Sequence, residues 1–348
     1  MHLTFNRFFA SVIIIFFCGA VNANSEEKEL KVLQFNIWQE GTVVPGGFEG
    51  IVNNIISLDP DLITFSEVRN YKQVDFIPRL VRALAIKGKT YFGEVSTSTG
   101  IISKYKIEKQ EVVFPLGDDH GSVLKACVKI DGKEVVLYSA HLDYLNCAYY
   151  LPRGYGSSDW KKLEAPVTDI DSLLADNRNS QRDDQVRAIL KDVQKEKVKK
   201  SIIFIGGDFN EPSHLDWQKD TKDIRDHQGV VINWDCSVLL SEGGFIDSYR
   251  EKYPDPVAYP GFTYPSNNME VDVKRLAWGP DADERERIDF IYYHPHPAIS
   301  LKDVQVVGPL GFILKGQRDN GGNDPQHIVP KDIWPTDHNA ILATFIIH

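Results

Sequence analysis

Short apolar runs recur along this chain, and several of them end abruptly at polar residues. The clearest is SIIFIGGDFN at residues 201–210, in which a hydrophobic run passes two glycines and reaches Asp208 and Asn210. Runs of this length are typical of buried strands, and helical segments lie between several of them. This alternation favours sheets flanked by helices. Because Gly, Asp and Asn are also common turn residues, the motif alone predicts either a strand-to-loop turn or a catalytic edge.

The spacing of apolar residues predicts where the elements lie. Asp131-Gly132 separates two apolar runs and is a strong hairpin signal. Helices are predicted at 48–58, 74–86 and 182–200. Strands are predicted at 30–38, 61–67, 122–130, 133–143, 201–210, 287–294 and 339–347. We find no internal repeat and no low-complexity linker.

The first residues have the layout of a secretory signal peptide. An early basic residue, an apolar stretch at 8–17 and the small residues Val21-Asn22-Ala23 predict that residues 1–23 are cleaved off. The apolar stretch is shorter than the roughly 20 residues that a membrane span requires. We therefore expect a secreted or periplasmic protein.

The charge and the cysteines narrow the function classes further. Cleavage leaves 38 basic against 49 acidic residues, a net charge of −11. Tight sequence-independent binding to nucleic acid relies on Lys and Arg, so this charge disfavours it without excluding a nuclease.

Three cysteines remain, so at least one thiol stays unpaired within the monomer that we expect, and pairing of Cys147 with Cys236 stays open.

Polar residues at the ends of the predicted strands carry the functional signal. They are Asn36, Glu67, His141, Asp208, Asn210, Asp289, Asp337 and His338. Each one alone is most often a cap, a turn or a structural residue. Their joint occurrence at successive strand ends predicts an active site.

On these residues the chain resembles the endonuclease/exonuclease/phosphatase superfamily, in its deoxyribonuclease I-like and neutral sphingomyelinase-like branch. The most specific motifs are GGDFN, RIDF and TDHNAILATF, supported by FNIW and SEV. The resemblance runs from about Leu30 to Phe345. It implies one catalytic domain at 24–348, with an insertion at about 144–180. The implied fold is an α/β four-layered sandwich with two central mixed sheets flanked by helices.

The resemblance also implies a role for each strand-end residue. Glu67 would be the principal ligand of Mg²⁺, for which Mn²⁺ or Ca²⁺ could substitute, with Asn36 and Asp337 as further ligands. Asp208 would orient or deprotonate the attacking water, and Asn210 would position the water or the phosphate.

Two histidines complete the implied catalytic set. His338, fixed by Asp289, would donate to a nonbridging oxygen or protonate the leaving group. His141 resembles a second histidine of the deoxyribonuclease I-like and sphingomyelinase-like branches. Trp38 stands where abasic-site endonucleases carry an acidic residue, which counts against a repair role.

The substrate stays open at this point. The insertion carries aromatics and cations that could stack on a sugar or a base, touch a lipid interface, or simply pack onto the body. Arg153, Tyr155, Trp160 and Thr263 are the candidate substrate-binding residues. A phosphodiester or a small sugar- or inositol-type phosphate is the leading substrate class. A secreted nuclease, a sphingomyelinase-like phospholipase C that binds a membrane surface, and a non-catalytic binding protein are the alternatives.

Overall fold

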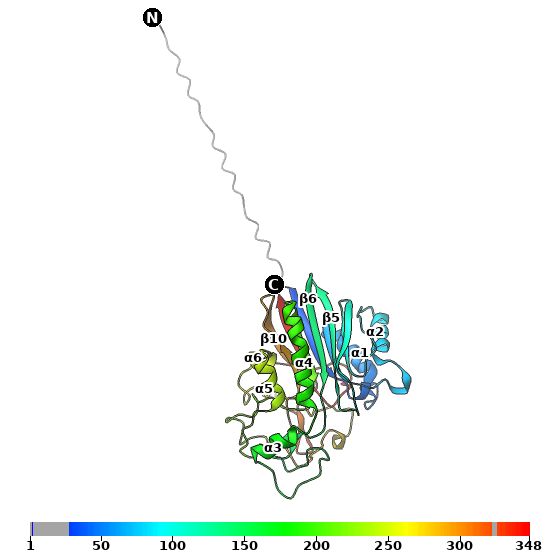
Figure 1. The fold of residues 1–348 in the computed structure, drawn as a ribbon. Helices are drawn as coiled ribbons and strands as arrows, with labels where there is room; N and C mark the ends of the chain where they lie inside the picture. Colours follow the sequence, from blue (N-terminus) through cyan, green and yellow to red (C-terminus); the bar gives the residue numbers. More distant parts are fainter. Residues whose placement is uncertain (1, 3–27, 322–325) are drawn as a thin grey trace.

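Two mixed sheets form the centre of the molecule in the computed structural model, which describes residue 2, residues 28–321 and residues 326–348 (Figure 1). Within this part of the chain, one six-stranded sheet has the order β13-β10-β14-β1-β2-β3 and the other has the order β4-β5-β6-β7-β9-β8. The first sheet contains β1 (Lys28–Asn36), β2 (Leu62–Val68), β3 (Ser98–Ser103), β10 (Ile299–Val307), β13 (His327–Ile328) and β14 (Ala340–Ile347). The second contains β4 (Ile107–Phe114), β5 (Ser122–Ile130), β6 (Lys133–His141), β7 (Ile202–Asp208), β8 (Ile246–Asp247) and β9 (Asp289–Tyr293). A separate hairpin joins β11 (Phe312–Leu314) to β12 (Gln317–Asp319).

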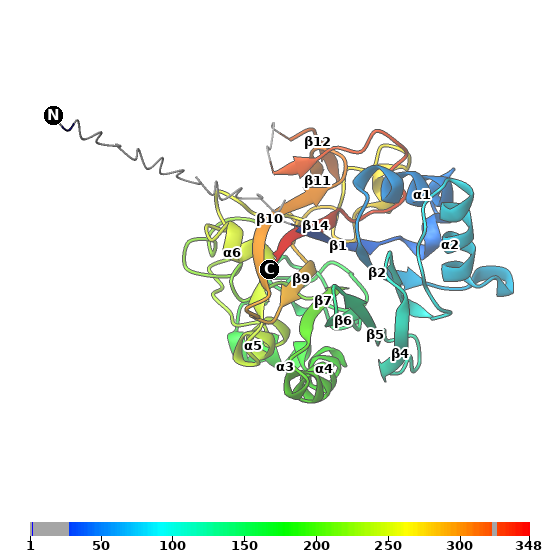
Figure 2. The same cartoon turned by 90° about the horizontal axis from the view of Figure 1, so that it is seen from above.

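Helices cover the outer face of each sheet (Figure 2). These covering helices are α1 (Gly47–Leu58) and α2 (Phe76–Ile86) on the first sheet and α4 (Arg182–Val198) and α5 (Asp235–Glu242) on the second. Two further helices lie elsewhere: α3 (Ile170–Asn177) belongs to the insertion, and α6 (Ser248–Lys252) contacts β8, β9 and β10. One apolar cluster lies between the two sheets and includes Val32 and Phe204. A second joins the first sheet to α1 and α2, and a third joins the second sheet to α4 and α5. The predicted four-layered sandwich is confirmed.

The strand directions bring the predicted site residues to one end of the sandwich. In the parallel pair β1–β2, β1 ends at Asn36 and β2 carries Glu67 one residue before its end. The parallel pair β6–β7 ends at His141 and Asp208. Because β9 runs antiparallel to β7, its first residue, Asp289, is the register partner of Asp208. Since β14 is likewise antiparallel to β1, the residues before it reach the same end.

The two glycines of the GGDFN motif allow close packing just before this end. A Cβ atom on Gly206 would lie 2.3 Å from Thr64 Oγ1 in the facing sheet. A Cβ atom on Gly207 would lie 2.4 Å from the carbonyl oxygen of Ala140 in the neighbouring strand. The motif is therefore glycine-rich because the backbone of β7 has close neighbours on both sides.

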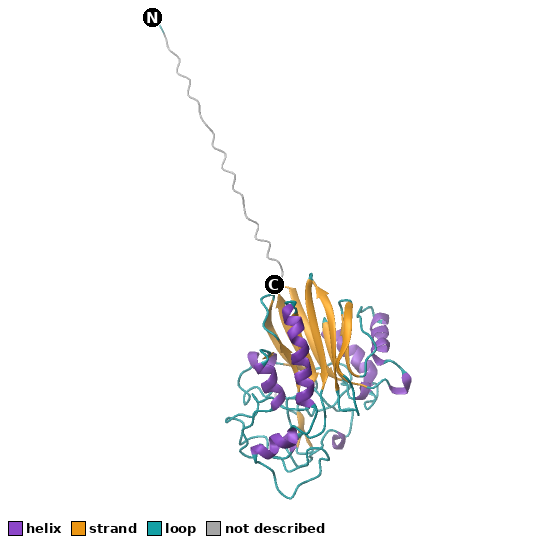
Figure 3. Cartoon of the chain, in the orientation of Figure 1, coloured by secondary structure: helices purple, strands orange, loops and turns teal. Residues whose placement is uncertain are grey.

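The segment 144–180, predicted to lack regular structure, contains a 3₁₀ turn at Ala148–Tyr150 and the helix α3. Figure 3 shows it among the loops that gather at the end of the sandwich opposite the C-terminus. Tyr149, Tyr150 and Tyr155 are buried there in a separate apolar cluster with Trp217. Much of the insertion is thus packed as a small additional core.

Apart from residue 2, the predicted signal peptide, residues 1–23, lies outside the described residues. Across the part of the chain that the structure does describe, no helix combines the length and the apolar character that crossing a bilayer requires.

Candidate active site

A cavity of about 310 Å³ opens at the strand ends identified above. Six of the eight strand-end residues line it: Glu67, His141, Asp208, Asn210, Asp337 and His338. The other two, Asn36 and Asp289, are completely buried directly behind the wall. The fold therefore brings together residues that are up to 302 positions apart in the sequence.

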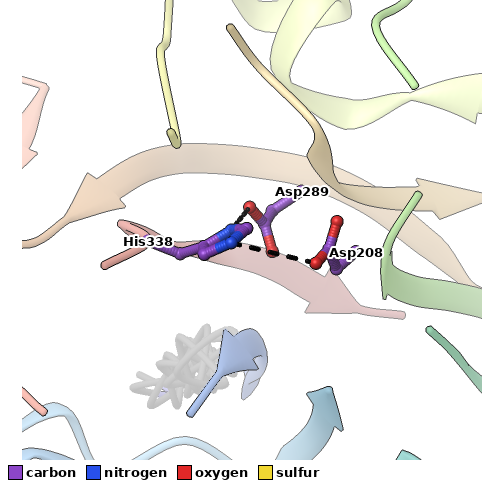
Figure 4. Close-up of side chains that lie close together, drawn as sticks. All are labelled: Asp208, Asp289 and His338. Atoms are coloured by element: carbon purple, nitrogen blue, oxygen red, sulfur yellow. Dashed lines mark hydrogen bonds and ion pairs between the residues drawn. The ribbon is translucent and has the colours of Figure 1, made fainter. Parts of the chain in front are cut away.

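His338 lies between two carboxylates (Figure 4). Its Nδ1 is 2.8 Å from Asp289 Oδ2, and its Nε2 is 3.9 Å from Asp208 Oδ2. Burial opposes charge on the imidazole, but the negative charges of Asp289 and Asp208 outweigh it and raise the pKa of His338 to about 10. This ring is therefore a cation at neutral pH.

The Asp208 carboxylate is held by two hydrogen bonds. Its Oδ1 accepts a hydrogen bond from the backbone N–H of Asn210 at 3.0 Å, and its Oδ2 accepts one from Asn36 Nδ2 at 2.9 Å. Burial and then the nearby Asp289 raise the pKa of Asp208 to about 7, although His338 opposes this shift. A carboxylate with such a pKa can take up or release a proton near neutrality.

Asn36 links Asp208 to Glu67. Its Nδ2 also donates to Glu67 Oε1 at 3.1 Å, while its Oδ1 accepts from the backbone N–H of Trp38 at 2.8 Å. The amide oxygen, expected to bind the metal, accepts one hydrogen bond from the backbone and keeps a second lone pair. Through its Nδ2, Asn36 also orients two carboxylates.

Glu67 and Asp337 are the carboxylates that fit a divalent cation. Each Glu67 oxygen has a single hydrogen-bond partner, with Gln39 N–H bonded to Oε2 at 2.9 Å, so lone pairs remain available. Burial, followed by repulsion from Glu67, raises the pKa of Asp337 to about 7. A hard cation with oxygen ligands would relieve this repulsion.

Asp208, Asp289 and His338 also lie close enough together to resemble a metal site, with one candidate ligand atom from each within 4.8 Å of the others. A protonated imidazole has no lone pair to offer a metal, however, and the pKa of His338 is raised to about 10. The donor set therefore favours the Glu67 side of the cavity for the cation and the His338 side for proton and hydrogen-bond donation.

His141 is the second buried histidine of the cavity. Its Nδ1 is 2.9 Å from the Ser98 hydroxyl oxygen. Burial, together with the positive charges of Arg69 and His338, lowers its pKa to about 3. His141 is therefore a neutral ring that can donate one hydrogen bond but carries no charge.

Asn210 is partly exposed at the cavity wall. Its backbone φ is 49°, in the left-handed region that Asn tolerates better than most residues. Its Nδ2 donates to the carbonyl oxygen of Leu142 at 3.0 Å, which fixes the loop after β7 against the loop after β6.

Three of the four predicted substrate-binding residues do not line the cavity. Arg153 is buried, and its guanidinium donates to Glu286 Oε1 at 2.6 Å, to Asp283 O at 2.6 Å and to Tyr149 O at 2.8 Å. The Tyr155 hydroxyl accepts from the backbone of Asp281. The Thr263 hydroxyl accepts from the backbone N–H groups of Ile288 and Asp289, at 3.0 and 3.1 Å. Arg153, Tyr155 and Thr263 are therefore corrected to internal structural contacts.

Trp160, the fourth, does line the cavity, together with residues that the sequence did not single out for a role. These include Gln39, Arg69, Asp119, Cys147, Tyr264 and Trp278. Arg69 forms an ion pair with Asp119. Because it lies two positions after Glu67, its position just after a strand end was a sequence signal that could have identified it as a site residue. Nothing in the sequence around Trp278 marks it, because it lies in an irregular loop.

Cys147 and Cys236 are buried free thiols in the described chain, as is Cys127, so the pairing that the sequence left open does not form. Glu211, behind Asn210, accepts from Asn177 Nδ2 and from the backbone N–H of Cys236, both at 2.7 Å. These contacts make Glu211 a structural anchor of the loop.

Comparisons with known proteins identify the family of this chain. A family model described as the Endonuclease/Exonuclease/phosphatase family matches residues 33–338. An uncharacterized protein of Caenorhabditis elegans is 28% identical over 346 residues, which cover 96% of each chain.

Solved structures share the fold at low sequence identity. TDP2 from D. rerio, complexed with single-strand DNA product, has a TM-score of 0.51 and 16% identity, covering 92% of this chain and 99% of that one. The human Nocturnin catalytic domain with bound sulfate has a TM-score of 0.50 and 14% identity, covering 92% and 95% of the two chains. These likenesses concern the fold, while the family model spans residues 33–338, the range that contains all eight strand-end residues. The chain therefore belongs to the endonuclease/exonuclease/phosphatase family and is a metal-dependent hydrolase of phosphate ester bonds.

Proposed function

We propose that this protein is an exported, Mg²⁺-dependent phosphoesterase that hydrolyses its substrate by direct attack of water, without a covalent enzyme intermediate. The observation that carries the proposal is the position of His338, held between Asp289 and Asp208 at the wall that Glu67 and Asp337 also line. A charged donor, a carboxylate with a pKa near neutrality and two oxygen ligands are the groups that this reaction requires.

The proposed mechanism divides the work between the two sides of the cavity. Glu67 and Asp337 would hold the cation, which supplies stabilisation of negative charge on the phosphate oxygens. Asp208 Oδ2 accepts a proton from the attacking water, and its hydrogen bond from Asn36 keeps it in place. His338 Nε2 donates to a nonbridging or leaving oxygen, while Asp289 holds its Nδ1.

The cavity favours a small phosphate ester, mono- or diester, over a long nucleic acid. Arg69 is the one Lys or Arg side chain among the described residues that line it, and Asp119 already pairs with it. Binding of a long nucleic acid relies on Lys and Arg side chains that neutralise successive phosphates, and the cavity lining does not provide such a series. The sphingomyelinase-like and nuclease alternatives are separated from this proposal by a substrate panel of plasmid DNA, RNA, sphingomyelin vesicles and sugar or inositol phosphates.

Replacement of the two key side chains tests the reaction class. His338→Ala and Glu67→Gln should each reduce kcat for bis(p-nitrophenyl) phosphate by about 100-fold or more, because one loses the charged donor and the other a metal ligand. Glu67→Gln should in addition require a higher Mg²⁺ concentration for half-maximal rate. His348→Ala and Glu49→Gln, at exposed positions, are the matched controls. Hydrolysis that persists in both active-site variants and in EDTA would refute the mechanism.

Export rests on the sequence of residues 1–23 alone. Expression of the full chain in a eukaryotic secretory system should release a protein that begins at Asn24, as N-terminal sequencing would establish. Retention of the intact N-terminus inside the cell would overturn this part of the proposal.

A further inference from the structure

Two unlike sets of side chains line the cavity. One set is the titratable groups described above. The other set, which we call the aromatic wall, consists of Tyr150, Trp160 and Trp278. The Tyr150 and Trp160 ring centroids are 6.5 Å apart with an interplanar angle of 89°, and those of Trp160 and Trp278 are 4.6 Å apart with an angle of 35°. The three rings therefore contact one another in sequence along one side of the cavity.

This aromatic wall is fastened by hydrogen bonds between two distant segments. Glu284 Oε2 accepts from the Tyr150 hydroxyl at 2.9 Å and from the backbone N–H groups of Trp278 and Gly279 at 3.0 and 2.9 Å. A salt bridge between Lys162 and Asp281 joins the same two segments a few residues away. The insertion and the loop before β9 are thus tied into one rigid surface.

The outermost ring of the aromatic wall, that of Trp278, is more exposed than its packing against Trp160 requires. Trp278 is 51% exposed, and Trp160 is partly exposed, whereas Tyr150 is buried beneath them. Tryptophan is highly buried on average, so a half-exposed indole on a pre-ordered surface at a cavity wall is suited to covering a ligand.

The charges of the cavity restrict what such a ligand can be. Glu67, Asp208 and Asp337 face the cation and the reacting phosphate, and Arg69 is engaged with Asp119. A second anionic group on the substrate would find no unengaged Lys or Arg among the described lining residues. The part of the substrate that meets the aromatic wall should therefore be uncharged, and flat enough to lie against an indole.

We propose that the aromatic wall is a subsite for an uncharged ring in the organic group of the phosphate ester, with that ring stacked on Trp278. The proposal rests on the proposed function for the position of the phosphate, and it specifies the substrate class. A nucleobase and the apolar face of a saturated sugar or inositol ring share the required chemistry.

Binding without turnover tests this subsite. The mature chain is titrated calorimetrically in EDTA with AMP, with myo-inositol 1-phosphate and with glycerol 3-phosphate, which has no ring. At least one ring-bearing ligand should bind about tenfold more tightly than glycerol 3-phosphate. Preference for AMP would identify a nucleobase, and preference for the inositol ester a saturated ring.

Variants separate stacking from a general structural role. Trp278→Ala should reduce the affinity for the ring-bearing ligand to that for glycerol 3-phosphate, whose own affinity should not change, and Trp278→Phe should restore part of the difference. Ile86→Ala, which removes an exposed apolar side chain at the end of α2, should change neither.

Different experimental outcomes would contradict the ring subsite and the proposed function. Equal affinity of the wild-type chain for all three ligands would overturn the ring subsite. So would an equal loss of affinity for all three ligands in Trp278→Ala, or a variant that loses only its binding to sphingomyelin vesicles. Ring-selective binding without hydrolysis of any phosphate ester would instead overturn the phosphoesterase proposal and leave the subsite standing.

Discussion

At the scale of single residues, the active site depends on contacts that hold its polar groups as much as on those groups themselves. Ser98 is buried, and its hydroxyl is 2.9 Å from His141 Nδ1. Ser98→Ala would leave that ring nitrogen unpaired, and we expect about a fivefold loss of kcat/KM, since one orienting hydrogen bond contributes about 1 kcal/mol. Ser96→Ala is the matched control, because the Ser96 hydroxyl has no hydrogen-bond partner among the residues that the structure describes. Equal rates in the two variants would exclude a positioning role for Ser98.

The sequence located the reacting groups because each stands where an apolar run stops. It could not locate Ser98, or Gln34, whose Nε2 lies 3.2 Å from Ser66 Oγ and 3.4 Å from Asp289 Oδ1 between the sheets. Partners of this kind come from other strands, so no local pattern marks them. The same limit explains Arg153: a cation among aromatics suggests a ligand site, but here it pairs with the buried Glu286.

At the scale of elements, Arg182 at the start of α4 anchors the beginning of the insertion. It is buried and donates to the carbonyl oxygens of Asp143, Leu145 and Asn146 at 2.8, 2.6 and 2.6 Å. Arg182→Lys keeps the charge but loses the planar set of donors, so several buried carbonyls would lose their partner. We expect the free energy of unfolding to fall by about 2–4 kcal/mol. Arg187→Lys, on the exposed face of the same helix, should change it by less than about 0.5 kcal/mol. Urea denaturation of both variants makes the comparison, and similar midpoints would contradict this role.

Helices α1, α2 and α4 and the strands that carry the site were predicted within a few residues, because their apolar periodicity is strong and their ends have turn residues. Strands β3, β4 and β10 were not predicted. Charged and polar side chains interrupt the apolar residues of β4 and β10, so neither reads as an apolar run. The insertion has no periodicity because its order comes from buried aromatics and from Arg182, which are tertiary contacts.

At the scale of the whole molecule, the pairing of strand ends explains why a prediction from one sequence could reach the site. Neighbouring parallel strands must end at the same edge of their sheet. Because the two sheets face each other, these two edges lie on opposite sides of one cavity. The aromatic wall of that cavity is set by loops, and only Trp160 of its members was anticipated.

The pH dependence of global stability follows from a buried ionic cluster between α4 and the second sheet. Asp192 Oδ2 lies 2.6 Å from Lys125 Nζ and 2.8 Å from the Tyr138 hydroxyl. Burial opposes ionisation of Asp192, but hydrogen bonds from Lys125, Lys195 and Tyr138 outweigh it and lower its pKa to about 2. A carboxylate with a lowered pKa in the folded state contributes stability above its unfolded pKa of about 4, and this contribution disappears as the pH falls through about 2.

Asp192→Asn should therefore reduce the free energy of unfolding by about 1–2 kcal/mol at pH 7. The difference from the wild type should shrink steadily as the pH falls from about 4 to 2, because the wild-type carboxylate then becomes neutral as well. Urea denaturation at a series of pH values measures both effects. Asp220→Asn, at an exposed carboxylate, should show neither. A difference for Asp192→Asn that stays constant across this range would mean that shape, and not charge, holds α4 against the sheet.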